Sequence, residues 1–159
     1  MMRFSYLRVL LLLVVCVSPA LASEQFQQPT EEELKMTSDP KAPGAAAVYL
    51  YYEETTDNSN HVHAYYVRIK VLTEKGKELA TVRIPYLRGE TKIKAVKGRT
   101  IQPDGTVIPL AVKPEDLVDV KTKDFQENAI VFTLPAVEVG SILEYSLEIH
   151  YNETMISEP

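Results

Sequence analysis

Two histidines, His61 and His63, come nearest in this chain to the spacing of a metal site. They stand two positions apart in a segment that alternates like a β-strand, so both side chains point to the same face. A structural zinc site takes four ligands, and the others would have to come from His150, Glu53 or Glu54. The alternative is that both histidines are ordinary polar residues at the exposed start of a strand.

A short basic stretch could bind an anionic ligand. Lys92 and Lys94 share one face of an alternating segment, so they could present cations to an anionic glycan or an acidic partner. The alternative is a solvated strand face whose lysines discourage edge-to-edge aggregation.

Tyrosines are concentrated in the first half of the β-rich region. Neighbours in a strand face opposite ways, so one member of each Tyr-Tyr pair should be more exposed than the other. Exposed tyrosines such as Tyr52 and Tyr66 could line a sugar or peptide groove, whereas buried ones would fill the core. The group comprises Tyr49, Tyr51, Tyr52, Tyr65, Tyr66 and Tyr86.

No pattern in the sequence matches a catalytic motif. Serine, histidine and aspartate are present, but no serine lies in a G-x-S-x-G elbow. The adjacent carboxylates of Glu53-Glu54 and Glu115-Asp116 would point to opposite faces of a strand. There is no phosphate-binding loop or dinucleotide fingerprint. The sequence therefore predicts no catalytic residue and no cofactor.

The single cysteine, Cys16, lies in a segment with the pattern of a signal peptide. Arg3 and Arg8 form a positive region before the apolar run Val9 to Val17. Ser18 and Pro19 end the run, and the small-x-small sequence Ala20-Leu21-Ala22 follows. The run is too short to cross a bilayer, which takes about twenty residues. We expect residues 1–22 to be cleaved, which would leave a periplasmic or secreted product with no thiol and no membrane span. Such a product could neither use a cysteine nucleophile nor form a disulfide.

The charge balance excludes one class of partner. The chain has 17 Lys and Arg residues against 22 Asp and Glu, a net charge of −5, and loss of residues 1–22 would make it more acidic. Nucleic-acid binding depends on neutralising phosphates, so we expect no nucleic-acid partner.

A polar lead-in occupies residues 23–46. Thr30 and Glu33 could form a capping box for a short helix, and Pro40 and Pro43 mark a linker after it. We expect this lead-in to be an ordered arm packed against the edge of the following domain.

Residues 47–159 show the pattern of strands. Segments such as HVHAYYVRIKVLTE and SILEYSLEIHY alternate with a period of two. Turn signals separate them, among them Pro103-Asp104-Gly105 and a predicted tight hairpin at Glu74–Lys77 in which Gly76 takes a positive φ. About eight strands at this spacing predict an all-β fold, an antiparallel β-sandwich.

Three segments together resemble a known family. They are YYVRIKVLTEKGKELATVRIPY, VKGRTIQPDGTVIPL and FTLPAVEVGSILEYSLEIHY. The resemblance is to the bacterial domain of unknown function, number three-eight-five-seven, that precedes transglutaminase-like domains, and it covers about residues 47–152. It implies a β-sandwich in an exported or envelope protein, usually followed by a papain-like Cys-His-Asp domain.

The 159 residues contain no such catalytic domain, so the resemblance implies no activity for them. We therefore expect a non-catalytic exported module that packs against a protein partner or a missing C-terminal domain. The alternative is an envelope module that binds a glycan or a peptide, with Tyr52, Tyr66, Lys92 and Lys94 as candidate ligand-binding residues.

Overall fold

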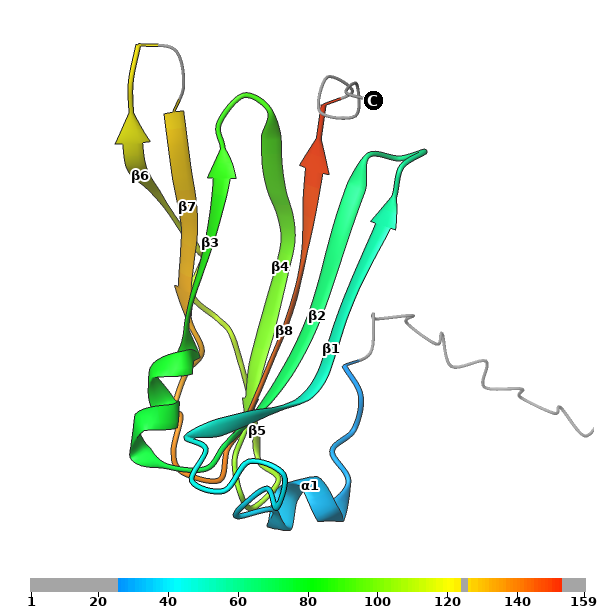
Figure 1. Cartoon of the computed structure of the whole chain (residues 1–159), viewed down its shortest axis with the longest axis vertical. Coiled ribbons are helices and arrows are strands. Elements are labelled where there is room, and N and C mark those ends of the chain that lie inside the picture. Colours follow the sequence, from blue (N-terminus) through cyan, green and yellow to red (C-terminus); the bar gives the residue numbers. More distant parts are fainter. Residues whose placement is uncertain (1–25, 124–125, 153–159) are drawn as a thin grey trace, which may run out of the picture.

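The computed structural model describes residues 26–123 and 126–152, which contain eight strands in two antiparallel sheets (Figure 1). The larger sheet has the order β1-β2-β8-β4-β5 and the smaller has the order β3-β7-β6. The predicted all-β, antiparallel sandwich is confirmed. The predicted signal peptide, residues 1–22, lies outside the described residues. The strands are β1 (Ala47–Asp57), β2 (Val62–Val71), β3 (Thr81–Leu87), β4 (Thr91–Ile101), β5 (Val107–Pro109), β6 (Glu115–Lys121), β7 (Gln126–Thr133) and β8 (Ile142–Tyr151).

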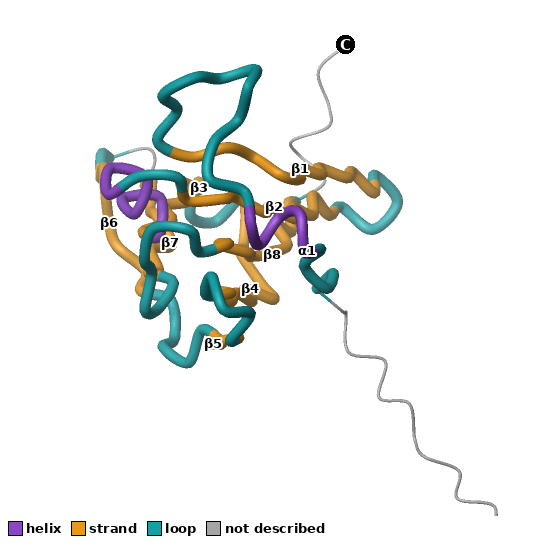
Figure 2. The backbone as a smooth tube through the Cα atoms, turned by 90° about the horizontal axis from the view of Figure 1, so that it is seen from below, coloured by secondary structure: helices purple, strands orange, loops and turns teal. Residues whose placement is uncertain are grey.

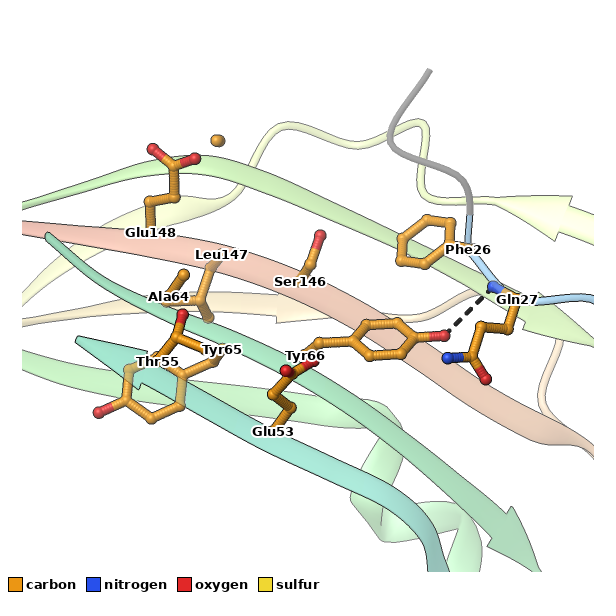
Figure 3. A pocket seen from close by; sticks show the side chains of 11 residues that line it. Phe26, Gln27, Glu53, Thr55, Ala64, Tyr65, Tyr66, Ser146, Leu147 and Glu148 are labelled. Atoms are coloured by element: carbon orange, nitrogen blue, oxygen red, sulfur yellow. Dashed lines mark hydrogen bonds between the residues drawn. The ribbon is translucent and has the colours of Figure 1, made fainter. Parts of the chain in front are cut away.

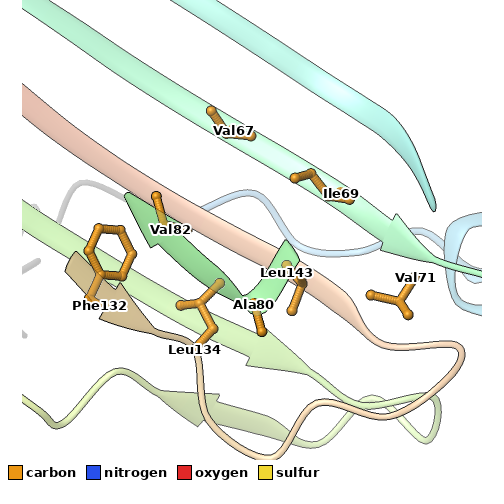
Figure 4. Packing of buried hydrophobic residues seen from close by; sticks show 8 residues of the cluster. All are labelled: Val67, Ile69, Val71, Ala80, Val82, Phe132, Leu134 and Leu143. Atoms are coloured by element: carbon orange, nitrogen blue, oxygen red, sulfur yellow. The ribbon is translucent and has the colours of Figure 1, made fainter. Parts of the chain in front are cut away.

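The core lies between the sheets and follows from strand alternation. In β2, Val67, Ile69 and Val71 point inward and are buried, as the period of two predicts. Leu143 and Leu147 of the neighbouring β8 lie on the same inner face. Figure 4 shows these β2 side chains facing buried residues of the smaller sheet, Val82 and Phe132, and two residues that flank its strands, Ala80 before β3 and Leu134 after β7.

One predicted turn is wrong. The segment after β2 is not a tight hairpin but a 3-10 helix, η1 (Glu74–Ala80), which carries the chain from one sheet to the other. Gly76 does not have a positive φ. A Cβ there would lie 2.2 Å from the carbonyl oxygen of Ala46, so close backbone approach is what requires glycine.

The other turn prediction holds. Gly105 has a φ of 89° and its N–H donates to the Gln102 carbonyl at 2.9 Å, closing the turn between β4 and β5. The left-handed conformation is one that glycine adopts without a steric penalty.

An N-terminal arm, residues 26–36, crosses the outer face of the larger sheet, on the side away from the smaller sheet (Figure 2). It contains α1 (Glu31–Lys35), and the predicted capping box is confirmed. Thr30 Oγ1 accepts from the Glu33 N–H at 3.1 Å, and Glu33 Oε2 accepts from the Thr30 N–H at 2.7 Å. Among the described residues, no helix is long and apolar enough to cross a membrane.

Candidate functional site

The outer face of the larger sheet carries buried charges where the arm covers it. Arg68 and Lys70 alternate with the core residues of β2, and Glu144 stands opposite Arg68 on β8. Arg68 is 1% exposed, and Lys70 and Glu144 are fully buried. Charged side chains are rarely buried unless they are paired, so their partners decide the role of this region.

We call Arg68, Lys70 and Glu144 the buried charge cluster, and Glu144 lies at its centre. Its Oε2 accepts from Arg99 Nε at 2.6 Å, and its Oε1 lies 3.8 Å from Arg68 Nη1. The Tyr66 hydroxyl also donates to Glu144 Oε1. Burial and this hydrogen bond raise the pKa of Tyr66 to about 12, so the phenol remains a donor at neutral pH.

The arm supplies the remaining partners. The Gln27 carbonyl accepts from Arg99 Nη2 at 2.7 Å and from Arg68 Nη1 at 3.4 Å. Glu33 Oε2 lies 3.3 Å from Arg68 Nη2, which adds a second carboxylate near that guanidinium.

Lys70 is held by carbonyl oxygens instead of a carboxylate. Its Nζ donates to the Leu34 carbonyl of the arm at 2.9 Å and to the Gly140 carbonyl at 2.5 Å. Burial lowers the pKa of Lys70, and Glu33 opposes that shift. The buried charge cluster is therefore used internally to fasten the arm to the sheet.

A polar pocket of about 370 Å³ adjoins the arm on the outer face (Figure 3). Phe26 and Tyr66 stack at one end of it, with ring centroids 6.1 Å apart. At the other end, Glu148 Oε2 lies 3.0 Å from His150 Nε2. The pocket combines three aromatic rings, two carboxylates and two aliphatic hydroxyl groups: Phe26, Tyr65, Tyr66, Glu53, Glu148, Thr55 and Ser146.

The inner face of β1 shows the opposite pattern, since large aromatic side chains are exposed there. Tyr49 and Tyr52 pair with the inward-facing Ile69 and Val67 of β2, so they lie on the core side of the sheet. Their exposures are nevertheless 64% and 54%, because β1 is the edge strand and the smaller sheet does not cover it. We call Tyr49, Tyr52, Tyr65 and Tyr145, together with Glu54, the tyrosine cluster.

An apolar cleft of about 320 Å³ enters the sandwich beside the tyrosine cluster. Tyr52, Tyr65 and Tyr145 form its polar edge. Its remaining walls come from four aliphatic side chains and a proline: Val67, Leu147, Ile149, Ile84 and Pro85. The inner faces of β1, β2 and β8, together with β3, thus form one opening at the side of the sandwich.

Glu54 fixes two of the phenols. It accepts from the Tyr65 hydroxyl at 3.0 Å through Oε1 and from the Tyr52 hydroxyl at 3.2 Å through Oε2. Burial, followed by the hydrogen bond to Glu54, raises the pKa of Tyr65 to about 12.

Tyr145 differs from these two phenols. Its ring packs edge-on against Phe132 with centroids 5.7 Å apart, while within residues 26–123 and 126–152 its hydroxyl forms no hydrogen bond. Burial raises its pKa to about 12, and the nearby phenols of Tyr49 and Tyr52 raise it further. Tyr145 therefore offers a protonated hydroxyl at the cleft.

The predicted histidine pair lies on one face, as expected. His61 and His63 both contact the Tyr151 ring, with centroid distances of 5.6 and 5.1 Å, and His63 Nδ1 lies 2.9 Å from Thr56 Oγ1. His150 lies on the opposite face of the sheet, because His63 pairs with Ile149. In the part of the chain that the structure describes, no three His, Cys, Asp or Glu residues form a group that could hold a metal ion.

The four predicted ligand-binding residues do not form one surface. Lys92 and Lys94 are exposed on the outer face, opposite His150 and Glu148 of β8, so their predicted common face is confirmed. Tyr66 lies on that face beneath Phe26, whereas Tyr52 lies on the inner face. A site that combines Tyr52 with the two lysines is therefore wrong for this fold.

The predicted difference in exposure is confirmed for Tyr51 and Tyr52, whereas Tyr65 and Tyr66 are alike in exposure. Tyr51 is 38% exposed and Tyr52 is 54% exposed, because neither face of the edge strand is fully covered where they lie. Tyr65 and Tyr66 are both half-buried, the former by the sandwich and the latter by the arm. The second pair does not separate because each of its rings is partly covered, one on each face of the sheet.

The adjacent carboxylates Glu53 and Glu54 point to opposite faces of their strand, as predicted. Glu53 lies on the outer face and Glu54 on the inner face. In the other pair, Asp116 accepts from Asn128 Nδ2 at 2.7 Å and from the Tyr86 hydroxyl at 2.8 Å. These hydrogen bonds, that of Asn128 first, lower the pKa of Asp116.

Sequence reasoning missed two members of the candidate site. The alternation of SILEYSLEIHY places Tyr145 on the apolar face of β8, but nothing in the sequence places that face at the opening of a cleft. Glu54 was considered only as a metal ligand or half of a carboxylate pair. Its spacing of two from Tyr52 was the available signal, since residues two apart share a strand face.

The comparison with protein families identifies the domain. Residues 57–158 match the family described as Domain of Unknown Function with solved-structure structure (DUF3857). The match extends over more than half of the chain, so the chain belongs to this family, as the resemblance implied. The arm and nearly all of β1 precede the matched residues.

A solved structure shares the fold. It is a crystal structure described as that of a "putative protease" from Parabacteroides distasonis ATCC 8503, with a TM-score of 0.59 and 15% sequence identity. The similarity covers 67% of this chain and 23% of the other, so this chain matches less than a quarter of that protein's length. At this identity the likeness shows the fold alone. A search of curated proteins finds no match.

Proposed function

We propose that this chain is a non-catalytic, exported interaction module that docks a protein partner or a further domain through the tyrosine cluster. One observation carries the proposal. Tyr49 and Tyr52 are more than half exposed on a face that forms the core elsewhere. Tyrosine is favoured at protein interfaces because its ring supplies contact area and its hydroxyl forms hydrogen bonds.

The polar arrangements in the structure support a non-catalytic role. The buried charge cluster is occupied by the arm, and the two carboxylates of each adjacent pair face apart or are held by neighbours. The sequence after residue 22 offers no cysteine nucleophile. Purified residues 23–159 are therefore expected to show no hydrolysis or transfer of amide bonds. Thiol-type amide chemistry in that preparation would refute the non-catalytic role.

Export is part of the proposal and has its own test. The amino-terminal sequence of the protein recovered from the cells that produce it should begin at Ser23. A mature chain that retains Met1 would contradict export by a cleaved signal peptide.

Site-specific photo-crosslinking tests the docking surface. A photoreactive phenylalanine analogue is placed at Tyr52 or, as the matched control, at Tyr51 of the full chain in those cells. The two residues are adjacent but face opposite sides of the sheet. We expect an adduct of one defined mass from Tyr52 and none from Tyr51. Equal labelling from both positions, or no adduct from Tyr52, would contradict docking at the cluster.

A second candidate is an envelope module that binds a glycan or a peptide. The cleft of about 320 Å³ beside the tyrosine cluster favours it, because rings that line a groove suit either ligand. An array of glycans and peptides probed with the purified chain, and with Tyr52→Ala as the control, distinguishes this candidate from docking to a folded partner.

A further inference from the structure

We infer that the tyrosine cluster and its cleft bind a proline-rich segment in the polyproline II conformation with a basic residue at one end. This inference rests on the proposed function and specifies the chemistry of the partner. Three properties of the site support it: the composition of the cleft, the donors at its edge and the position of one carboxylate.

The composition of the cleft favours proline over sugar. Five of its lining residues are Val67, Leu147, Ile149, Ile84 and Pro85, which offer no side-chain hydrogen bond. A sugar would leave hydroxyl groups unpaired against these walls, and unpaired buried polar groups are costly. A proline ring is apolar, and aromatic-lined grooves are the usual receptors of proline-rich segments.

The edge of the cleft supplies the hydrogen-bond donors that such a segment lacks. A polyproline II helix has no internal hydrogen bonds, so its carbonyl groups are free to accept. Tyr145, which lines the cleft, presents its hydroxyl without a partner among the described residues. Tyr49 lies beside the cleft on β1, and its hydroxyl also forms no hydrogen bond among those residues. The hydroxyls of Tyr52 and Tyr65 already donate hydrogen bonds to Glu54 and are therefore not free to donate to the segment.

Glu54 gives the site its charge preference. It accepts from both fixed phenols and lies on the exposed inner face of β1. No lysine or arginine of residues 26–123 and 126–152 lines the cleft, so a cation on the partner would be the complement of this carboxylate. The acidic net charge of the chain, −5, acts in the same direction.

A labelled peptide tests the inference. The probe is a fluorescent peptide of about ten prolines with one arginine at an end, long enough to extend across the site at about 3.1 Å per residue. We expect fluorescence anisotropy to show saturable binding to the full chain. Chito-oligosaccharides of similar length should not compete. Absence of peptide binding, or competition by the oligosaccharide, would overturn the inference.

Variants locate the binding. Tyr145→Phe keeps the ring against Phe132 and removes one donor, so we expect about fivefold to tenfold weaker binding. Glu54→Gln should lower the preference for the arginine-bearing peptide over the all-proline peptide by about threefold. Tyr51→Phe and Glu53→Gln, on the outer face, are the controls and should bind like the parent chain. Equal binding by the parent, Tyr145→Phe and Glu54→Gln would refute the site.

The two proposals can fail separately. If the Tyr52 cross-link forms but the peptide does not bind, docking at the cluster stands and the proline-rich partner is rejected. If the peptide binds to the control variants and the cluster variants alike while no Tyr52 adduct forms, both are rejected.

Discussion

The two faces of the larger sheet distribute polar and aromatic side chains in opposite ways. On the outer face, Arg68, Lys70 and Glu144 are buried under the arm. On the inner face, which is otherwise core, Tyr49 and Tyr52 of the edge strand β1 are more than half exposed, because the smaller sheet leaves them largely uncovered. Burial in this domain is therefore set by what covers a face, and only secondarily by the polarity of the residues on it.

The difference assigns different roles to the two regions. Buried charges need partners within the protein. On the outer face Glu144, the carbonyl groups of the arm and Glu33 supply them, although Arg68 Nε and Nη2 form no hydrogen bond among the described residues. Exposed aromatic rings carry no such requirement and remain available for a second molecule. We therefore expect changes on the outer face to alter stability and changes on the inner face to alter binding.

The largest effect is expected at the centre of the buried charge cluster. Glu144→Gln removes the charge that Arg68 and Arg99 share, which should lower the free energy of unfolding by about 3–5 kcal/mol. Glu148→Gln, on the same face of β8 but 36% exposed in its side chain, is the control and should cost less than about 1 kcal/mol. Urea unfolding measures both. If Glu144→Gln and Glu148→Gln have the same free energy of unfolding, the charge of Glu144 does not stabilise the folded chain.

A smaller effect is expected where the arm meets the cluster. Glu33→Gln weakens the ion pair with Arg68 and the charged half of the capping box, which should cost about 1–2 kcal/mol. Glu32→Gln, in the same helical turn but exposed, is the matched control. If the two variants unfold at the same urea concentration, the arm does not depend on Glu33.

Alkaline pH should weaken both regions through their phenols. Tyr66 under the arm and Tyr65 and Tyr145 in the cluster have pKa values of about 12, against an ordinary value of 10.0. Between these values the unfolded chain loses phenol protons that the folded chain keeps, so stability falls as pH rises from about 10 to 12. Lys70 has the opposite effect on stability. Its pKa is lowered in the folded chain, so the folded chain loses this proton at a lower pH than the unfolded chain, and this contribution to stability increases as the pH rises between the two pKa values.

Two variants measure separately how the phenols of the two regions contribute to the loss of stability in that pH range. Tyr66→Phe and Tyr145→Phe should each make the loss of stability less steep, as measured by chemical unfolding at a series of alkaline pH values. Tyrosinate absorbance of the folded protein reports the pKa values directly. A parent chain whose stability does not change from pH 10 to 12 would contradict the raised values.

The smallest effect on stability is expected on the exposed inner face. The double change Tyr49→Ser and Tyr52→Ser should alter the free energy of unfolding by less than about 0.5 kcal/mol, as surface substitutions usually do. The same variant should lose the Tyr52-dependent interactions proposed above. A loss of several kcal/mol on unfolding would place these rings in the core and remove the contrast between the two faces.

Much of the fold was predictable because its signals are local. The alternation in β2 and β8, the turn at Pro103-Asp104-Gly105 and the capping box of Thr30 and Glu33 depend on residues within a few positions of one another. Gly76 was misassigned because its constraint is not local, since the atom that a side chain would strike belongs to Ala46.

The candidate site was less predictable for the same reason. Strict alternation would place Tyr49 and Tyr52 on opposite faces, but a register shift between Tyr49 and Tyr51 brings both to the inner face. Tyr145 and Pro85 reach the cleft from strands far along the chain. Grouping Tyr52 with Lys92 and Lys94 failed because sequence shows which residues of one strand share a face, but not how the faces of separate strands combine.

By itself the sequence determined the all-β class, the membership in the domain family, the alternating faces of β2 and β8 and the absence of a thiol after residue 22. The tertiary structure decided which faces are covered. Alternation assigns a side chain to a side of its own strand, whereas burial depends on what another segment places over that side. For this reason only the assembled fold shows buried charges beneath the arm and exposed tyrosines at the edge of the core.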